Sequence, residues 1–190
     1  LVLLHGTSSS LHTWDGWVKH LNHDFRLVRL DLPGFGLTGP HPQGDYSLAA
    51  YSEFLHAFAK RLKLNKFHIA GNSLGGAIAV QYTLDHGPNI QKLILIDPAG
   101  LPQKNLDSVL NLTRLPGSNI VMQIITPRFL FHQALEDVYA DDSKISEALV
   151  DRYFQLTLRK GNRRALVQRM NTGIEDLGFR LKQIHQPTLL

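Results

Sequence analysis

The sequence predicts an α/β protein: a doubly wound, mainly parallel sheet with a helical cap inserted into it. Two observations predict this fold class. Short apolar runs alternate with helical segments over residues 1–100, and helical periodicity dominates after that point. Continuous apolar runs of this length are typical of strands buried on both faces, as they are in parallel sheets. The 190 residues, 43% of them hydrophobic, are sufficient for one sizeable core.

The expected elements of the core follow in order along the chain. Apolar runs predict strands at residues 1–4, 25–30, 67–70 and 93–96. Ser47 is a suitable N-cap for a helix with an apolar stripe, and a mostly apolar helix runs from Leu74 until Gly87 ends it. Because strands alternate with helices, these elements indicate βαβ units around a parallel sheet.

The alternation stops after Gly100. Residues 101–119 have the composition of a connecting segment, because Pro, Asn and Ser are frequent there. Residues 141–143 offer N-cap side chains for a helix, and two further helical runs are expected at 163–170 and 175–184. The first of these helices would carry one apolar stripe, made of Ile145, Leu149, Tyr153 and Leu156. The sequence therefore predicts a core, a helical cap and a returning core strand over residues 1–100, 101–183 and 184–190.

The composition excludes several classes of protein. The chain has no cysteine, which excludes a disulfide framework, a cysteine-ligated metal site and a thiol nucleophile. No apolar run approaches the roughly 20 residues that a membrane-spanning helix needs. The net charge of +4 is modest and the basic residues are scattered, so nucleic acid is not expected as a partner. A solvated helix face is the expected explanation for the basic residues of the cap, namely Arg152, Arg159, Lys160, Arg163, Arg164 and Arg169.

The strongest motif is Gly-Asn-Ser-Leu-Gly at residues 71–75, which lies between an expected strand and an expected helix. A Gly-x-Ser-x-Gly pattern in this context is typical of a sharp turn that presents a nucleophilic serine. Small residues are needed two positions before and after Ser73, because larger side chains would collide across the turn. The sequence therefore predicts Ser73 as the nucleophile at the carboxyl edge of the sheet, where open α/β sheets bind ligands.

Two backbone N–H groups are expected to hold a developing negative charge beside Ser73. One belongs to Leu74, at the start of the helix, and the other to Thr7, in the turn after the first strand. His5 ends that strand and is expected to make a structural hydrogen bond rather than to act as a base. Asp31 is expected to bond the turn that follows it, and a catalytic part for it is the minor alternative.

These residues together resemble the α/β-hydrolase superfamily. The resemblance covers nearly the whole chain and is carried by the motifs at residues 1–7, 31–36, 71–76 and 93–97, together with Trp14. It is strongest to the branch that contains carbon–carbon-bond hydrolases, haloalkane dehalogenases and epoxide hydrolases. That branch carries a helical cap after the sixth strand of the family's sheet, which is where this chain leaves the β/α alternation. Dehalogenases and epoxide hydrolases use aspartate at the elbow, whereas serine implies acyl transfer to water.

The resemblance also implies a triad acid and a histidine after the nucleophile. Both chain ends fall within strand-like runs, so the 190 residues are expected to be the central piece of a longer hydrolase. This piece is expected to lack both the acid and the histidine. His132 falls in the expected cap and His185 precedes the last strand, so neither is expected to be the base. Asp97 stays open: it is a turn residue in the favoured interpretation and a triad acid in the other.

The leading hypothesis is a serine hydrolase that cleaves small carboxylic esters or related carbonyl compounds through an acyl-enzyme. The alternatives are a carbon–carbon-bond hydrolase of vinylogous diketones and a non-catalytic α/β-hydrolase fold that binds a ligand. The expected partner is a small-molecule substrate, with neither metal nor organic cofactor, and the cytoplasm is the default location. An apolar cleft is expected under the cap, with five candidate lining residues: Trp14, Phe35, Leu74, Phe129 and Phe131.

Overall fold

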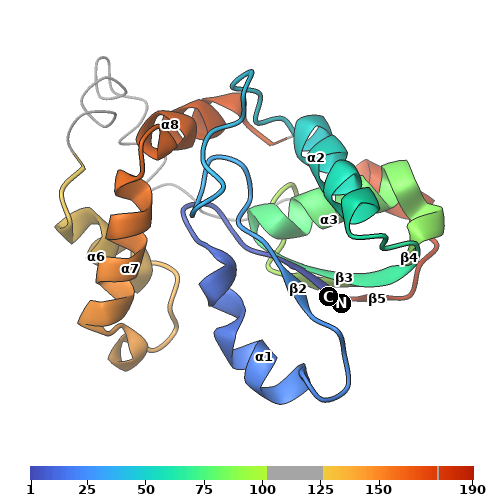
Figure 1. The fold of residues 1–190 in the computed structure, drawn as a ribbon, viewed down its shortest axis with the longest axis horizontal. Coiled ribbons are helices and arrows are strands. Elements are labelled where there is room, and N and C mark those ends of the chain that lie inside the picture. Colours follow the sequence, from blue (N-terminus) through green and yellow to red (C-terminus); the bar gives the residue numbers. More distant parts are fainter. Residues whose placement is uncertain (102–125, 175) are drawn as a thin grey trace.

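The computed structural model describes residues 1–101, 126–174 and 176–190. Its centre is a parallel sheet of five strands in the order β2-β1-β3-β4-β5 (Figure 1). The strands are β1 (Val2–Leu4), β2 (Val28–Arg29), β3 (Phe67–Asn72), β4 (Ile90–Ile96) and β5 (Thr188–Leu189). All four pairings are parallel, so the carboxyl ends of the strands meet at one edge of the sheet. The predicted fold class is confirmed.

The strand predictions differ from the structure mainly in length. β3 and β4 extend beyond the predicted runs at residues 67–70 and 93–96, because both are paired in the middle of the sheet. The run at residues 25–30 yields only the two-residue β2, an edge strand that pairs with β1 alone. Its apolar residues Phe25 and Val28 are only partly covered, as expected at a sheet edge.

Helices cover both faces of the sheet. On one face, helices α2 (Leu48–Arg61) and α3 (Leu74–His86) pack against the strand residues Val2, Leu4 and Ile69. On the other face, the 3-10 turn η1 (Leu11–Trp14) and helix α1 (Asp15–Leu21) pack against Leu3 and Ala70. Successive strand residues therefore face opposite helical layers, which explains why the runs are apolar at every position. The prediction of a doubly wound sheet is confirmed.

The ends of α2 and α3 follow from their sequence. The hydroxyl of Ser47 accepts a hydrogen bond from the Ala50 N–H at 3.2 Å, as expected of an N-cap. α3 ends at Gly87, where the short turn η2 (Gly87–Asn89) leads into β4. α3 is buried over most of its circumference, because it packs against β1, β3, β4 and α2.

In the described part of the chain between β4 and β5 lie the helices α6 (Phe129–Glu136), α7 (Glu147–Leu158) and α8 (Asn162–Thr172). They are seen beside the sheet, with α6 and α7 paired and α8 next to the loops above β2 (Figure 1). A separate apolar cluster, centred on Phe131, Leu135 and Val150, holds α6 to α7. The predicted division at residues 100 and 183 stays a prediction, and the expected connection at 101–119 lies almost entirely outside the described residues.

Two helix boundaries in this part were predicted wrongly. Asp141 caps only the 3-10 turn η3 (Asp142–Lys144), and Ser146 caps α7 by accepting from the Leu149 N–H at 3.2 Å. The run expected as a helix over 175–184 forms the 3-10 turn η4 (Gly178–Gln183). Position 175 is not among the described residues. No helix in the described part of the chain combines the length and apolarity that crossing a membrane requires.

Candidate active site

The turn between β3 and α3 has the strained geometry expected of a nucleophile elbow. Ser73 has φ 50° and ψ −117°, a conformation that side chains other than glycine rarely adopt. It is the N-cap of α3, yet its hydroxyl makes no capping hydrogen bond. The half-buried hydroxyl is therefore available at the carboxyl edge of the sheet, next to the positive end of the helix dipole.

Close contacts explain why three glycines lie around Ser73. A Cβ atom on Gly71 would lie 2.1 Å from the carbonyl oxygen of Gly75. A Cβ on Gly75 would lie 2.2 Å from the carbonyl oxygen of Leu4, and one on Gly76 would lie 2.7 Å from the Cβ of Pro98. The first contact closes the turn, whereas the other two let α3 approach β1 and the segment after β4. The predicted steric role of Gly71 and Gly75 agrees with these distances.

Main-chain hydrogen bonds hold the elbow to the end of β4. The Ser73 N–H donates to the carbonyl oxygen of Ile96 at 3.0 Å, and the Ala99 N–H donates to the carbonyl oxygen of Ser73 at 3.0 Å. Asp97 lies between these partners, is exposed, and has φ 42°. Aspartate tolerates the left-handed region better than most residues, which agrees with its role in the turn. The structure thus brings Asp97 beside the elbow and leaves both interpretations of it testable.

The turn after β1 approaches Ser73 closely. A Cβ on Gly6 would lie 3.2 Å from the Cβ of Ser73. The Ser9 N–H donates to the Gly6 carbonyl oxygen at 3.3 Å, so Thr7 and Ser8 are the central residues of a turn, and Ser8 has φ 57°. Neither the Thr7 nor the Leu74 N–H has a hydrogen-bond acceptor among the described residues. Both N–H groups therefore remain available as donors near Ser73.

His5 and Asp31 have structural partners. The Nδ1–H of His5 donates to the Gly6 carbonyl oxygen at 2.7 Å, and its Nε2 accepts from the Leu32 N–H at 2.9 Å. Complete burial lowers the pKa of His5 to about 4, so the ring is neutral near pH 7. The two oxygens of Asp31 accept from the N–H groups of Leu11 and Leu37, at 2.7 and 2.8 Å. The structural interpretation of both residues agrees with these bonds.

Among the described residues, no histidine forms a hydrogen bond with the Ser73 hydroxyl. His5 has both nitrogens engaged, and His132 lies on α6 with its Nδ1 3.3 Å from a carboxylate oxygen of Glu136. His185 precedes β5 and therefore lies toward the amino edge of the parallel sheet, opposite the elbow. Next to it, the Gln186 side chain bonds the carbonyl oxygen of Gly87, at the far end of α3. All ten histidines of the sequence fall within the described residues.

The five residues expected to line an apolar cleft do not lie around one common cavity in the described part of the chain. Trp14, Phe35 and Leu74 belong to the core clusters, Phe131 packs between α6 and α7, and Phe129 is 59% exposed. Only Phe35 borders a cavity between the core and the later helices, which measures about 10 Å³. A larger hollow of about 480 Å³ lies on the α1 face of the sheet and is not lined by Ser73. Among the described residues, no group of three or more His, Asp or Glu side chains could hold a metal ion.

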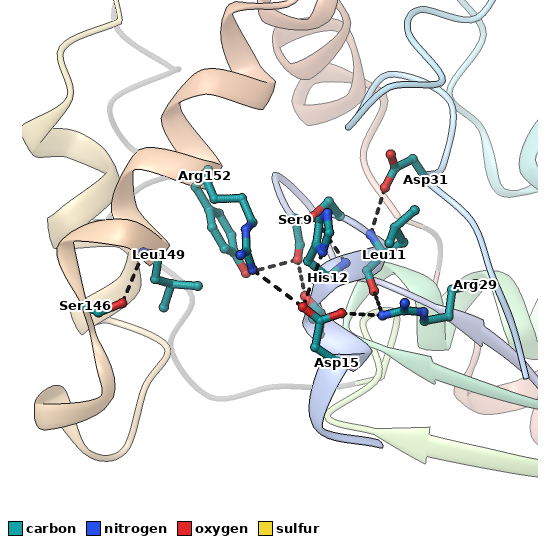
Figure 2. Close-up of polar contacts among 12 residues, drawn as sticks. Ser9, Leu11, His12, Asp15, Arg29, Asp31, Ser146, Leu149 and Arg152 are labelled. Carbon is teal, nitrogen blue, oxygen red and sulfur yellow. Dashed lines mark hydrogen bonds and ion pairs between the residues drawn. The ribbon is translucent and has the colours of Figure 1, made fainter. Parts of the chain in front are cut away.

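Contacts between the core and the helices α7 and α8 were missed by the sequence reasoning. Figure 2 shows that the guanidinium of Arg152 on α7 lies 3.6 Å from the carboxylate of Asp15. The same carboxylate pairs with Arg29 at 2.5 Å. Next to Arg152, the Tyr153 hydroxyl lies 3.0 Å from the Ser9 hydroxyl. Arg169, expected on a solvated face, is instead 4% exposed. Its guanidinium donates to the carbonyl oxygens of Tyr46 and Gly173, a role that no local sequence signal indicates.

Several known proteins are similar in sequence to part of this chain. A family model described as the alpha/beta hydrolase fold matches residues 1–143. Monoacylglycerol lipase abhd6-B of Xenopus laevis is 38% identical over 103 residues, which cover 53% of this chain and 31% of that protein. N-formylmaleamate deformylase of Pseudomonas putida is 35% identical over 98 residues, covering 52% of this chain and 37% of that protein. The matched part thus spans about a third of the length of these relatives.

The solved structures agree on the fold. A meta-cleavage product hydrolase from Pseudomonas fluorescens IP01 superposes with a TM-score of 0.78 at 21% sequence identity. The superposition covers 98% of this chain and 69% of that one. At this identity the likeness supports the shared architecture, and the chemistry has to be argued from the site itself.

Proposed function

Since the chain belongs to the α/β hydrolase fold family, we propose that it carries the nucleophile and oxyanion donors of a serine hydrolase. The observation that carries the proposal is the backbone of Ser73, held at φ 50° and ψ −117° between β3 and α3. Strain of this kind persists only where the surroundings impose it, and here the hydroxyl is left without a capping bond. A structural serine would gain nothing from that arrangement.

The reaction follows from the groups present. The Ser73 hydroxyl oxygen attacks the carbonyl carbon of the substrate and gives its proton to a histidine outside these residues. The negative charge that develops on the carbonyl oxygen is stabilised by the N–H groups of Thr7 and Leu74. The leaving group departs with the proton from the histidine. A water molecule then gives a proton to the histidine and attacks the acyl carbon, and the histidine returns this proton to the Ser73 oxygen as the acid is released.

The substrate class is a small carboxylic ester or a related carbonyl compound. Serine at position 73 favours an acyl-enzyme, because a serine alkyl ether would be too stable to hydrolyse. The relatives named a monoacylglycerol lipase and an N-formylmaleamate deformylase support this class, since both names describe action on an acyl group. The proposed steps themselves need neither a metal nor an organic cofactor.

The test is active-site labelling of the protein expressed from its full reading frame. A fluorophosphonate probe is expected to label the protein at Ser73, and the label is expected to disappear in Ser73→Ala. Ser143→Ala is the matched control, because Ser143 is exposed in η3 and should leave labelling unchanged. Failure of the folded, full-length protein to label would contradict the proposal and favour a non-catalytic ligand-binding fold. Labelling with turnover of vinylogous diketones, but not of esters, would assign the carbon–carbon-bond alternative.

A further inference from the structure

We propose that Tyr153 on α7 is a positioning residue for the turn that presents the Thr7 N–H. The inference rests on the proposed function, because it assigns Tyr153 to the oxyanion donor of that same site. In this arrangement α7, one of the helices between β4 and β5, fixes the geometry of a catalytic turn in the core.

The contact that carries the inference joins two hydroxyl groups. The Tyr153 Oη lies 3.0 Å from the Oγ of Ser9, and Ser9 Oγ also bonds the hydroxyl of Thr13. Ser9 is the same residue whose N–H closes the turn around Thr7 by donating to Gly6. Tyr153 therefore holds the residue that closes the turn, one position after the strained Ser8 and two after the donor itself.

The turn needs such external support. Its closing hydrogen bond is 3.3 Å long, and Ser8 at its third position has φ 57°, which is unfavourable for a residue with a Cβ. Thr7 is exposed, so packing does not fix its backbone. With one long bond and one strained residue, the turn would relax if its other contacts were removed.

The two ends of the segment are held independently of Tyr153. On one side, β1 pairs with β2 and β3 up to Leu4. On the other side, the Asp31 carboxylate fixes the N–H of Leu11 at 2.7 Å, and Arg29 binds the Leu11 carbonyl oxygen at 3.3 Å. The part left between them is the turn itself, where the Tyr153 contact adds a bond from α7 to the local bonds that Gly6 and Ser9 make with His5, Thr13 and each other.

Tyr153 is suited to this task because its own position is fixed. Its ring is half-buried and packs against the cluster of Phe131, Leu135 and Val150. Its neighbour Arg152 forms an ion pair with Asp15 at 3.6 Å, which keeps α7 against the segment that follows the turn (Figure 2). The two adjacent residues of α7 thus contact the core on either side of Thr13.

An oxyanion donor acts on the charge that develops in the transition state, so its displacement should lower kcat more than it changes KM. In full-length protein, Tyr153→Phe removes the hydroxyl and keeps the ring. We expect kcat for a p-nitrophenyl ester to fall by about tenfold while KM changes by less than about twofold. The affinity for an alkyl boronic acid, which forms a tetrahedral adduct with the serine, should weaken by a similar factor.

Matched variants separate positioning from stability. Ser9→Ala should reproduce the loss, and the double variant should lose no more, because both changes remove one shared contact. Tyr139→Phe is the control, since Tyr139 packs on the same cluster but its hydroxyl does not bond the turn. Unchanged kcat and boronate affinity in Tyr153→Phe would overturn the inference, as would an equal loss in Tyr139→Phe. Activity that survives in Ser73→Ala would instead overturn the proposed function, so the two failures are distinguishable.

Discussion

The Nε2 atom of His5 accepts a hydrogen bond from the backbone N–H of Leu32 at 2.9 Å, which joins the end of β1 to the loop after β2. This bond requires a neutral ring, because a protonated imidazole has no acceptor. The site's two neighbouring loops, one with the Thr7 donor and one with Asp31, are therefore connected through a histidine that must stay uncharged.

Acidification should destabilise the folded chain through His5. Burial lowers its pKa to about 4, whereas the unfolded value is about 6.5, so the unfolded state binds the proton first. The contribution of the neutral His5 ring to the free energy of unfolding is complete above pH 6.5. It is lost as the pH falls toward 4, by up to about 3 kcal/mol. His68 and His86, whose pKa values are also lowered by burial, act in the same direction.

Urea unfolding between pH 7.5 and pH 4.5 measures this loss. Nitrogen chemical shifts of His5 supply the residue-specific check, since they should stay those of a neutral ring at pH 5. A free energy of unfolding that does not change over this range would contradict the assignment.

The substitution Gly75→Ala should disrupt the packing of α3 on the sheet. The added Cβ would lie 2.2 Å from the carbonyl oxygen of Leu4 and 2.6 Å from that of His5, and both are backbone atoms that cannot rotate away. We expect a loss of about 2–4 kcal/mol in the free energy of unfolding. Gly16→Ala in α1 is the matched control, because nothing lies within 4 Å of its Cβ and alanine favours a helix. Equal stability of the two variants would contradict the steric argument.

Removing the Asn162 side chain should loosen α8 from the core. This residue is 2% exposed, and its amide donates to the carbonyl oxygens of Gly36 and Leu156 at 2.9 and 2.8 Å. Asn162→Ala leaves both acceptors buried without these donors, which should cost about 1–3 kcal/mol. Thr172→Ala, which removes one exposed bond to Gln168, should cost less than about 0.5 kcal/mol. Chemical denaturation compares them, and similar midpoints would count against a structural role for Asn162.

Replacing Asp97 tests the two interpretations of this residue. As a turn residue it can be exchanged for asparagine, which also tolerates its φ of 42°. We expect Asp97→Asn to keep the rate of fluorophosphonate labelling of the full-length protein within about threefold of the original. A triad acid would behave differently, because its loss slows catalysis by about 10⁴-fold. A loss of that size would assign Asp97 as the acid.

Residues 1–190 alone should show negligible ester hydrolysis, even when circular dichroism shows them folded. Ser73 needs a base to lose its proton, and none of the ten histidines, all of them described, hydrogen-bonds its hydroxyl. The measurement compares this segment with its Ser73→Ala variant and with the full-length protein. Hydrolysis at the full-length rate would show that the base lies within these residues.

The parts of the fold that sequence predicts well are those that depend on local patterns. The apolar runs locate β1, β3 and β4, Ser47 marks the start of α2, and glycine spacing identifies the elbow. Helix starts are predicted less well where two nearby residues could each serve as the N-cap. Asp141 and Ser146 both offer capping oxygens, and local composition does not show that Asp141 caps η3 while Ser146 caps α7.

The contacts between distant segments could not be predicted at all. Tyr153 satisfies the spacing of an apolar stripe, which conceals that its hydroxyl bonds Ser9, 144 residues earlier. Arg169 likewise has the composition of a solvated helix face, yet the backbone of Tyr46 and Gly173 surrounds its charge. Periodicity shows which side of a helix is buried, but it does not show which partner lies opposite.

The main-chain bonds of Ser73 to Ile96 and Ala99 have an evolutionary consequence. They fix the elbow without using the side chain, so the turn does not depend on which small residue occupies position 73. A substitution at this position can therefore change the chemistry of the side chain while the turn and the sheet around it keep their fold. The chemistry of such a turn can thus diverge faster than the architecture that holds it.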